Sequence, residues 1–525
     1  VVSDRHARGN ALPTPDATSN LLASGLSKTG VEETKPEEPV APDSKIRLEF
    51  SRYLDTCDAE DVAIQRGTTR VIWATSDDKV GESGPHKHTK KGGKSITFLG
   101  EQQEIPMPSD AQELDLTLDS ASVGLGTSYG FGDDRTVYYC QPFALPTLTS
   151  KAHILKVAPV LDTSRVHHLV LYECETLSTA DLAYKGPCHN HQAPEGIRRC
   201  NGGTPVVVWA VGGTEFYWPE EAGYPLGPGG LQYALLEVHF DNPALVPFED
   251  SSGLRLTYSW QLRPHDAGVY FTGYDVSDKM EIPPGESSYT IETYCPSACT
   301  QRQIPPEGIN VFSTMLHSHL AGHKMSAHLI RNGTEVLQLG SEPYYDFNYQ
   351  QFVGFARPFP VMRAGDAISL QCTYRTTGRD FVTTGGLGSF DEMCLMYMQY
   401  YPRMDDPGRE PCMYLYVDPD TGHQVRPTDA NAVNLAWCGE AISNFSTSFT
   451  PREEVCIAGS GAEVEPLGSE GYEHSVALDE EGTTMLHWRV NESSSVVHMA
   501  IEAEAEGWVG VGFSPNGAMR GADIV

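Results

Sequence analysis

The sequence predicts an all-β protein that contains several antiparallel β-sandwiches. Short apolar runs rich in β-branched and aromatic residues recur along the chain, and the periodicity of long amphipathic helices is missing. The 50 glycines and 36 prolines agree with this, because both residues end strands and form turns. At 525 residues the chain is too long for one core, so we expect about three domains.

The apolar runs divide the chain into consecutive blocks. Residues 11–45, rich in proline, threonine, serine and glutamate, predict a flexible loop. Two strand-like runs, IRLEF and TTRVIWAT, come next, and residues 77–95 predict a polar insertion. Two long blocks of short strands, residues 104–290 and 291–440, each predict a β-sandwich. A further set of strand-like runs begins near residue 472.

The composition excludes some classes of partner. A net charge of −33 argues against nucleic acid or an anionic membrane surface, because both would repel the chain. No stretch of about 18 apolar residues is present, so we expect no membrane-spanning helix. The chain starts at Val1 without a signal peptide, so we expect that a leader was removed or that the chain is a segment of a longer protein.

The cysteines indicate an oxidising compartment. Twelve cysteines, an even number without a CxxC pair, predict six disulfides. Sequons at Asn332, Asn444 and Asn491 are compatible with N-glycosylation. We therefore expect a secreted, extracellular protein or one in the lumen of a secretory vesicle.

Histidines on predicted strands form the first candidate metal site. His167 and His168 are adjacent inside an apolar run, and His239 lies in the run LLEVHF. Adjacent residues of a strand point to opposite faces. His167 and His168 can therefore share one ion only at a twisted or bulged position. A lone histidine on a strand is more often a core residue than a ligand, so the evidence lies in the combination.

A second candidate site combines two histidines with a methionine. One residue separates His317 from His319, and on a strand this spacing points both side chains to the same face. Met393 would add a thioether, a soft ligand that favours Cu(I) over zinc. The alternative is that Met393 fills a hydrophobic core.

Five long motifs carry a family resemblance. They occur in the order VHHLVLYEC, WAVGGTEFYWPEEAGYPLGPGG, LLEVHFDNP, MLHSHLAGHKM and GGLGSFDEMCLMYMQYYP, within residues 130–440. This part of the chain resembles the copper type II, ascorbate-dependent monooxygenases, the family of dopamine β-hydroxylase and peptidylglycine α-hydroxylating monooxygenase. The resemblance implies two consecutive jelly-roll-like copper domains, two coppers per chain and ascorbate as the reductant.

The resemblance also implies a division of labour between two copper sites. The copper that takes electrons from ascorbate would be held by His167, His168 and His239. The copper that reacts with dioxygen beside the substrate C–H bond would be held by His317, His319 and Met393. All six positions carry the residue types that the family uses, so the ligand set indicates a working enzyme.

The expected substrate is small and resembles a phenylethylamine. The peptide-amidating branch of the family has an arginine two residues before the HxH pair, where this chain has Met315. Asp391 and Glu392 are candidates to meet a substrate ammonium, and the alternative is a solvated acidic pair at the start of a strand. Tyr397 stands where the family has a pocket tyrosine, and the alternative is a structural role.

The family further implies how the cysteines pair. The implied disulfides are Cys140–Cys188, Cys174–Cys200, Cys372–Cys394, Cys295–Cys412, Cys299–Cys438 and Cys57–Cys456. The first three close loops around the strands that carry the proposed ligands, which would limit movement of the histidines.

The two ends of the chain resemble complementary halves of a DOMON domain, a small β-sandwich. The segment from Tyr472 to Val525 resembles the first half, and the start of the chain resembles the second half. Half a sandwich exposes an apolar face and unpaired strand edges. The halves could fold together in one chain, complement the next subunit in a filament, or belong to a tandem array of repeats. The break inside one domain favours the last two together over the first.

The sequence predicts these boundaries: 1–75, C-terminal half of the DOMON domain; 76–129, insertion and linker; 130–290, N-terminal copper domain; 291–440, C-terminal copper domain; 441–470, linker; and 471–525, N-terminal half of the DOMON domain. Some DOMON domains bind haem b through a methionine and a histidine. Met519 occupies the methionine position, but its partner is not evident, with His86 and His88 as candidates, so we do not expect haem b.

These observations predict an enzyme that hydroxylates an aliphatic C–H bond of a small molecule with O2. The alternative is a structural repeat of an extracellular tandem or filamentous assembly that uses the monooxygenase fold as a scaffold. In either case we expect self-association through the complementary DOMON halves. The sequence gives neither the physiological substrate nor the copper occupancy.

Overall fold

The protein is seen in a computed structural model that is nearly all β. The structure describes residues 5–6, 14–15, 21–29, 45–58, 61–65, 68–77, 88–99, 105–123, 136–163, 165–188, 192–201, 203–210, 215–242, 245–347, 350, 352–386, 390–404, 412–443, 445–452, 471–479, 481–491, 493–505, 508–514 and 523–524. The chain divides into two compact units. The terminal unit contains residues 1–99 and 453–525, and the central unit contains residues 100–452.

The terminal unit contains two mainly antiparallel sheets. One sheet has the order β3 (Leu21–Thr29), β4 (Lys45–Tyr53), β36 (Val496–Glu504), β35 (Thr484–Asn491), β34 (His474–Ala477). The other has the order β2 (Thr14–Pro15), β1 (Arg5–His6), β38 (Asp523–Ile524), β37 (Trp508–Phe513), β5 (Thr68–Ser76), β6 (Lys90–Thr97). Both sheets therefore combine strands from the beginning of the chain with strands from its end.

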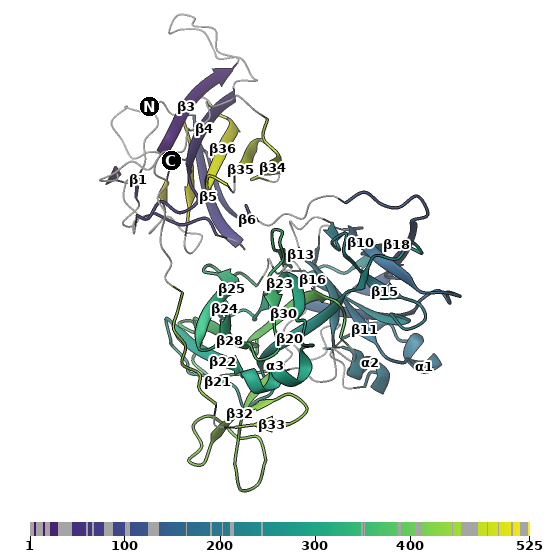
Figure 1. Ribbon diagram of the computed structural model, residues 1–525. Helices are drawn as coiled ribbons and strands as arrows, with labels where there is room; N and C mark the ends of the chain where they lie inside the picture. Colours follow the sequence, from purple (N-terminus) through teal and green to yellow (C-terminus); the bar gives the residue numbers. More distant parts are fainter. Residues whose placement is uncertain are drawn as a thin grey trace, which may run out of the picture. The chain divides into compact units, whose positions relative to one another are not determined.

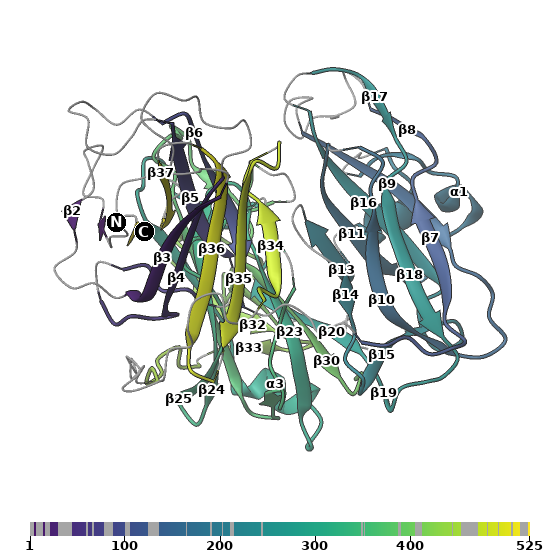
Figure 2. The same cartoon turned by 90° about the horizontal axis from the view of Figure 1, so that it is seen from above.

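The two ends of the chain complete one another within the same molecule. Strand β4 pairs with β36 from Lys45↔Glu504 to Tyr53↔Val496, and β5 pairs with β37. Figures 1 and 2 show the purple strands β3 and β4 beside the yellow strands β34–β36. This differs from the expectation that a second subunit or a tandem neighbour supplies the missing half. A tether holds the two halves at a high effective concentration, which favours pairing inside the chain.

Alternation along β4 separates a core face from a polar face. Ile46, Leu48 and Phe50 are buried, and the residues between them carry charge. Aromatic rings from distant segments meet in this core, with Phe98 lying 5.4 Å from Trp488 between ring centroids. Such alternation is what a sheet needs when one of its faces is covered by a second sheet.

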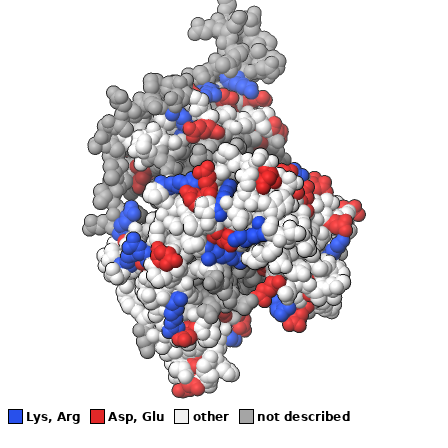
Figure 3. Space-filling model, turned by 45° about the vertical axis from the view of Figure 1, so that its right-hand side comes forward, with Lys and Arg blue, Asp and Glu red and all other residues white. Residues whose placement is uncertain are grey.

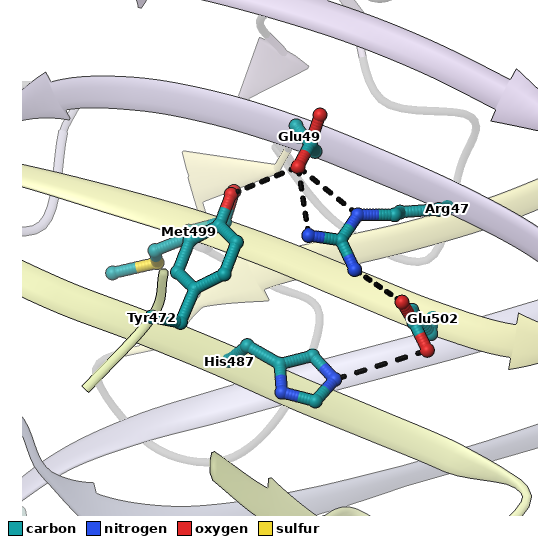
Figure 4. A network of polar contacts seen from close by, with 6 residues as sticks. All are labelled: Arg47, Glu49, Tyr472, His487, Met499 and Glu502. Carbon is teal, nitrogen blue, oxygen red and sulfur yellow. Dashed lines mark hydrogen bonds and ion pairs between the residues drawn. The ribbon is translucent and has the colours of Figure 1, made fainter. Parts of the chain in front are cut away.

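A polar network on the other face links the same two ends of the chain (Figure 4). The Arg47 guanidinium donates to Glu49 on its own strand and to Glu502 on β36. The hydroxyl of Tyr472 donates to Glu49 over 3.1 Å, and His487 Nε2 lies 3.9 Å from Glu502. Because these groups are half-buried, their ion pairs are only partly screened by solvent. The network therefore adds to the pairing of β4 with the C-terminal strands.

Two edge strands lie where the sequence predicted loops. Strand β3 falls inside the predicted flexible loop 11–45, and β6 begins inside the predicted insertion 77–95 and ends two residues beyond it. Each is bonded to a single neighbour, β4 or β5. Edge strands often carry lysine because its charge discourages pairing with other chains, and both β3 and β6 contain lysine. Because these two strands lack alternating apolar residues, the sequence pattern did not predict them as strands.

The central unit begins with a β-sandwich that carries the first three histidines. One sheet has the order β19 (His265–Asp266), β15 (Ala222–Leu226), β10 (Ala152–Val160), β18 (Gly253–Ser259), β7 (Gln112–Thr117), with β14 (Phe216–Tyr217) beside β10. The facing sheet has the order β12 (Gly186–Pro187), β9 (Thr136–Ala144), β16 (Tyr233–Asp241), β11 (Val166–Cys174), β13 (Pro205–Ala210). A ribbon of β8 (Ala121–Val123) and β17 (Phe248–Asp250) and the short helices α1 (Thr179–Leu182) and α2 (Glu195–Cys200) complete it.

A second sandwich follows in the central unit. Its larger sheet has the order β26 (Val353–Gly354), β23 (Ile309–His317), β30 (Leu395–Tyr401), β20 (Gly268–Tyr274), β31 (Cys412–Val417), β32 (Val433–Trp437), β33 (Ala441–Ile442), with β27 (Val361–Met362) beside β23. Its smaller sheet has the order β22 (Tyr289–Cys295), β28 (Ala367–Tyr374), β24 (Gly322–Arg331), β25 (Thr334–Glu342). The ribbon of β21 (Glu281–Ile282) and β29 (Thr383–Thr384) and the helix α3 (Ser297–Gln303) lie beside them.

Strand pairing moves three of the predicted boundaries. Strand β7 pairs with β18, so the first sandwich already includes part of the predicted linker 76–129. Strand β20 pairs with β30, so the second sandwich begins well before residue 291. Strand β33 pairs with β32, so this sandwich also extends into the predicted linker 441–470. Local patterns identify the strands, but only lateral pairing assigns each one to a sheet.

The two sandwiches of the central unit share a continuous core and polar contacts. Phe312, Met315 and Tyr401 of the second sandwich belong to the hydrophobic cluster of the first. The side chain of Gln399 donates to the Val206 carbonyl over 3.1 Å. These contacts hold the sheet of β11 and β16 against the sheet of β23 and β30.

Disulfides cross-link the central unit at five places. The structure contains Cys140–Cys188, Cys174–Cys200, Cys295–Cys412, Cys299–Cys438 and Cys372–Cys394, which are five of the six implied pairs. Of the sixth implied pair, Cys456 lies outside the described residues. None of the described helices is long and apolar enough to cross a membrane. Acidic and basic side chains are interspersed on the face drawn in Figure 3.

The core that strands from both ends of the chain form in the terminal unit can be tested with Phe50→Ala. Removing this fully buried ring is expected to lower the free energy of unfolding of the terminal unit by about 3–5 kcal/mol. Differential scanning calorimetry should show one transition moving down while the transition of the central unit stays in place. The control is Glu504→Ala, at an exposed position of β36. A parent-like transition in Phe50→Ala would contradict this account of the core.

Candidate metal centres

The first histidine cluster is built on a β-bulge. His168 on β11 lies directly opposite His239 on β16 in the strand register. The register shifts between Val166 and His168, so His167 is the extra residue of the bulge. A bulge re-aims one side chain of its strand. His167 therefore reaches the side of the sheet that His168 occupies, as sharing of one ion requires.

The three imidazoles present the same ring atom to a common point. Nδ1 of His168 lies 3.2 Å from Nδ1 of His167 and 3.3 Å from Nδ1 of His239. Two nitrogens that each lie about 2.0 Å from one ion at tetrahedral angles are about 3.3 Å apart. The spacing of the nitrogens thus fits a single transition-metal ion.

Burial favours the neutral form of His168, the central ligand of this cluster. Burial lowers the pKa of His168 well below its usual value, and the neighbouring histidines lower it further. A neutral imidazole is the form that binds a metal. The ring of Tyr138 on β9 stacks on His239 with centroids 4.3 Å apart, which fixes the plane of that ligand. His168 can therefore bind a cation without first losing a proton.

The second cluster joins the end of one strand to the start of another. His317 is the last residue of β23, and Met393 precedes β30, its neighbour in the sheet. Nε2 of His317 lies 3.2 Å from Sδ of Met393, and the ring of His319 lies 5.2 Å from that of His317. Two imidazoles and a thioether form a soft donor set, which suits Cu(I).

Hydrogen bonds to Nδ1 leave Nε2 of both histidines available. Nδ1 of His317 donates to the side-chain oxygen of Gln350, and Nδ1 of His319 donates to the Asp391 carbonyl over 3.1 Å. The Gln350 amide nitrogen donates to the Phe347 carbonyl, which fixes its oxygen toward His317. A proton held on Nδ1 places the lone pair on Nε2. Both rings are therefore in the tautomer that binds a metal through Nε2.

The HxH pair converges for a different reason from the one its spacing predicted. His319 lies in the loop that follows β23, so the alternation of a strand does not orient it. The loop is held instead by the Glu392 carboxylate, which accepts from the backbone N–H groups of His319 and Ala321 and from the Ser318 hydroxyl. The turn is thus fixed from inside the protein.

This arrangement gives Glu392 a role other than substrate binding. Its side chain is fully buried, and both carboxylate oxygens accept hydrogen bonds from the His319 loop. Burial raises its pKa to about 7, although the donors from Ala321, His319 and Ser318 act in the opposite direction. Glu392 is therefore neither a substrate contact nor the solvated residue that the alternative expected. Asp391, its neighbour, is half-buried.

Tyr397, the predicted pocket tyrosine, lies beside the second cluster. Its ring is 6.3 Å from that of His317 and 5.7 Å from that of Phe271, and it packs against the apolar group around Met393. Met315 is buried in the core that joins the two sandwiches, so it offers no polar contact to a substrate. The surroundings of Met393 are thus mainly apolar.

Other candidate sites are less developed. Two further groups of potential ligands among the described residues consist mainly of disulfide cysteines, namely Cys295, Cys299, Cys412 and Cys140, Cys188, Glu237. Asn332 is exposed at the turn between β24 and β25, and Asn491 ends β35. His88 packs edge-on against Trp508. Asn444, His86 and Met519 lie outside the described residues.

Sequence reasoning missed four residues that support the clusters. Tyr138 lies opposite His239 in the register, so a correct alignment of β9 with β16 would have found it. Tyr345, Phe347 and Gln350 come from the connection between β25 and β26. Gln350 lies 33 residues from His317 in the chain. The periodicity of apolar residues within a strand does not predict a contact over that separation.

Three domain models from two families match parts of the chain. The N-terminal domain of the copper type II ascorbate-dependent monooxygenases matches residues 127–247, and the C-terminal domain matches residues 265–415. The DOMON domain matches residues 480–525.

Curated relatives match about two thirds of the chain. DBH-like monooxygenase protein 1 of Gallus gallus is 37% identical over 368 residues, and that of Homo sapiens is 35% identical. Dopamine beta-hydroxylase of Homo sapiens is 31% identical over 364 residues. Each alignment covers 68% of this chain and 58% of the relative.

The role of Glu392 can be tested with Glu392→Gln, which keeps the size of the side chain but removes its charge. We expect the affinity of the second cluster for Cu(I) to fall about 10- to 100-fold, because outer hydrogen bonds orient metal ligands. Competition with a Cu(I) chelator measures the Cu(I) affinity of each cluster. The affinity of the first cluster should stay at the parent value. Asp380→Asn, at an exposed position of the same sandwich, is the control. Unchanged affinity at the second cluster would refute the role.

Glu237 makes stability depend on pH. Burial raises its pKa to about 7, although Asn201 donates to it over 2.7 Å. The folded chain keeps this proton up to about pH 7, whereas an unfolded glutamate loses it near pH 4.3. Its contribution to stability is therefore complete below about pH 4.3 and falls by about 3 kcal/mol as the pH rises to 7.

Denaturant unfolding of the metal-free protein between pH 4.5 and 8 provides the test, and Glu237→Gln should lack this part of the decline. Glu249→Gln, an exposed change in the same sandwich, should retain it. Identical pH profiles for Glu237→Gln and the parent would contradict the assignment.

Proposed function

The chain belongs to the copper type II ascorbate-dependent monooxygenases, and from this premise we propose that it hydroxylates an aliphatic C–H bond of a small, phenylethylamine-like molecule. The observation that supports this most directly is the pair of buried clusters with different donor chemistry in one unit. The chain spans 58% of the curated relatives it matches, so the activity is proposed for the region present here.

The two donor sets support separate tasks for two coppers per chain. Copper bound there would supply one-electron transfer from ascorbate at the first cluster and reaction with dioxygen at the second. Three imidazoles at His167, His168 and His239 suit an ion that cycles between Cu(I) and Cu(II). The thioether of Met393 favours Cu(I) at the second cluster.

The protein contributes orientation and exclusion of water. Gln350 and the Asp391 carbonyl accept the Nδ1 protons of His317 and His319. Glu392 fixes the loop that carries His319. Phe271 and Tyr397 surround Met393 with apolar surface, which suits a reactive site that must exclude competing reactions with water.

The choice of substrate rests on what lies near Met393. The buried Met315 stands where the peptide-amidating branch has an arginine, so no guanidinium is available there for a peptide carboxylate. The aromatic surfaces of Phe271 and Tyr397 suit an aromatic substrate. The relative named dopamine beta-hydroxylase acts on a phenylethylamine by its name, and we extend that substrate class to this chain. A substrate ammonium would need a partner other than Glu392.

The alternative function, a structural repeat of a filament or tandem array, loses its main support. It rested on the divided DOMON domain, and the two parts pair within one chain. Completing this domain therefore requires no second subunit, and no observation here supports self-association.

Secretion and glycosylation remain part of the proposal. Five disulfides in the central unit suit an oxidising compartment, and Asn332 is exposed in a sequon on a hairpin turn. We place the protein outside the cell or in the lumen of the secretory pathway.

The proposed activity is tested by copper stoichiometry and oxygen consumption with ascorbate and tyramine. We expect two coppers per chain and tyramine-dependent uptake, and Met393→Ala should lower this uptake about 100-fold or more while the first cluster stays loaded. Met485→Ala makes the same change in the terminal unit and should have no effect. Absence of copper at saturating supply would overturn the proposal, and two coppers without turnover would reject this substrate class.

A further inference from the structure

One buried carboxylate of the first sandwich lacks the hydrogen bonds that its depth requires. Glu237 on β16 is 4% exposed, and its Oε2 accepts from the Asn201 amide over 2.7 Å. Among the described residues, no other hydrogen bond and no ion pair reaches this side chain. Burial removes water from a carboxylate, so buried carboxylates normally accept several hydrogen bonds or pair with a cation. Oε1 of Glu237 is therefore an acceptor without a donor.

The other buried acids of the described central unit receive more donors. Three hydrogen bonds reach each carboxylate, and both oxygens accept, at Asp181, Asp250, Asp366 and Glu392. The fold thus satisfies these four carboxylates from within. Glu237 is the exception, and unused capacity on a buried acceptor is typical of a group that a ligand, an ion or water completes.

Glu237 points out of the core of its sandwich. Its neighbours Leu236 and Val238 fill that core. Side chains two residues apart on a strand share a face, so Glu237 lies on the same face of β16 as His239. This is the face that carries the ligands of the first cluster. The unused oxygen therefore belongs to the functional side of the sheet.

The charge of Glu237 also acts on the tyrosine beside the second cluster. Burial raises the pKa of Tyr397, and the negative charge of Glu237 raises it further. Burial and then Glu237 likewise raise the pKa of Tyr172 on β11. Tyr397 packs against the apolar group around Met393 and against the core that joins the sandwiches. Glu237 thus lies within electrostatic range of the pocket in which we place the substrate ring.

A phenylethylamine has two parts with different needs. Its ring suits the aromatic surfaces of Phe271 and Tyr397, whereas its ammonium needs an anion. Glu392 does not meet this need, because both of its oxygens hold a loop of the protein. Asp391 is half-buried, so water competes for its carboxylate. Glu237 is a buried carboxylate that keeps a free oxygen.

We propose that Glu237 binds the ammonium group of an amine substrate through Oε1. This proposal deepens the proposed function and rests on it. The ring of the substrate lies against the second sandwich, and its ammonium reaches the first. The ammonium supplies the cation that the fold does not provide for this carboxylate, and a charge-assisted hydrogen bond is stronger in a buried site than in water. Recognition of the amine therefore requires both sandwiches.

A purely structural role for Glu237 has a different consequence. Asn201, its hydrogen-bond partner, follows the last residue of α2. If Glu237 only held this end of the helix, its replacement would affect charged and neutral ligands alike. The distinguishing measurement therefore compares two ligands that differ in the ammonium group alone.

The test measures dissociation constants on the copper-loaded full chain without ascorbate, so that no turnover occurs. Tyramine is compared with 2-(4-hydroxyphenyl)ethanol, in which a hydroxyl replaces the ammonium. We expect Glu237→Gln to raise the Kd of tyramine about 10- to 100-fold, because a hydrogen bond between charged groups is lost. The Kd of the neutral alcohol should stay at the parent value.

Two further variants make the comparison specific. Glu237→Asp keeps the charge but withdraws it by one methylene group, so it should weaken tyramine selectively and by less than Glu237→Gln. Glu249→Gln removes an exposed charge from the same sandwich and should bind both ligands like the parent. This control separates Glu237 from the general attraction of a chain of net charge −33 for cations.

An unchanged Kd of tyramine in Glu237→Gln would overturn the inference, and so would an equal loss of tyramine and the alcohol. If Glu237→Gln does not fold, Glu237→Asp takes its place, and parent-like constants in that variant would reject the role. Because these constants need no turnover, Glu237-dependent binding without oxygen uptake would support the inference while rejecting tyramine hydroxylation. Tyramine-dependent oxygen uptake with the same KM in Glu237→Gln and the parent would keep the proposed function and reject the inference.

Discussion

Strand β11 is the element on which both candidate centres depend. Its bulge turns His167 to the side of His168, opposite His239 on β16. Farther along the same strand, Glu173 accepts from Arg403, which follows β30 of the second sandwich. Strand β30 begins two residues after Met393 of the second cluster. The ion pair of Glu173 with Arg403 therefore joins a strand that carries ligands of the first cluster to the strand next to a ligand of the second. Movement of β11 would therefore change the first cluster and the interface between the sandwiches together.

The second cluster depends on buried hydrogen bonds more than on strand geometry. The loop that holds His319 has no partner strand, so its backbone N–H groups need other acceptors. The Glu392 carboxylate supplies them, and a buried acceptor of this kind is strong because the surroundings screen it little. The methionine comes into place because it directly follows Glu392 in the chain. One carboxylate thus positions a histidine and, through its own backbone, the thioether.

The terminal unit follows a simpler rule, which is that unpaired strand edges need partners. Strands β4 and β36 come from opposite ends of the chain and pair along nine residues each. The polar network of Arg47, Glu49 and Glu502 spans this junction. Burial of Phe50 on the other face closes the core. An incomplete domain at each end thereby becomes a complete sandwich within one chain.

The sequence by itself determined the class of the fold, the residue types of both clusters and the pairing of ten cysteines. Alternation of apolar residues, motif order and resemblance carry that information locally. It did not reveal β3 and β6, whose polar composition suits sheet edges, or the sandwich to which β7 and β20 belong. Tertiary structure alone decided that the chain ends pair with each other and that Glu392 holds a turn. These outcomes arise from contacts between residues far apart in the chain, and such contacts leave no periodic signal in the sequence.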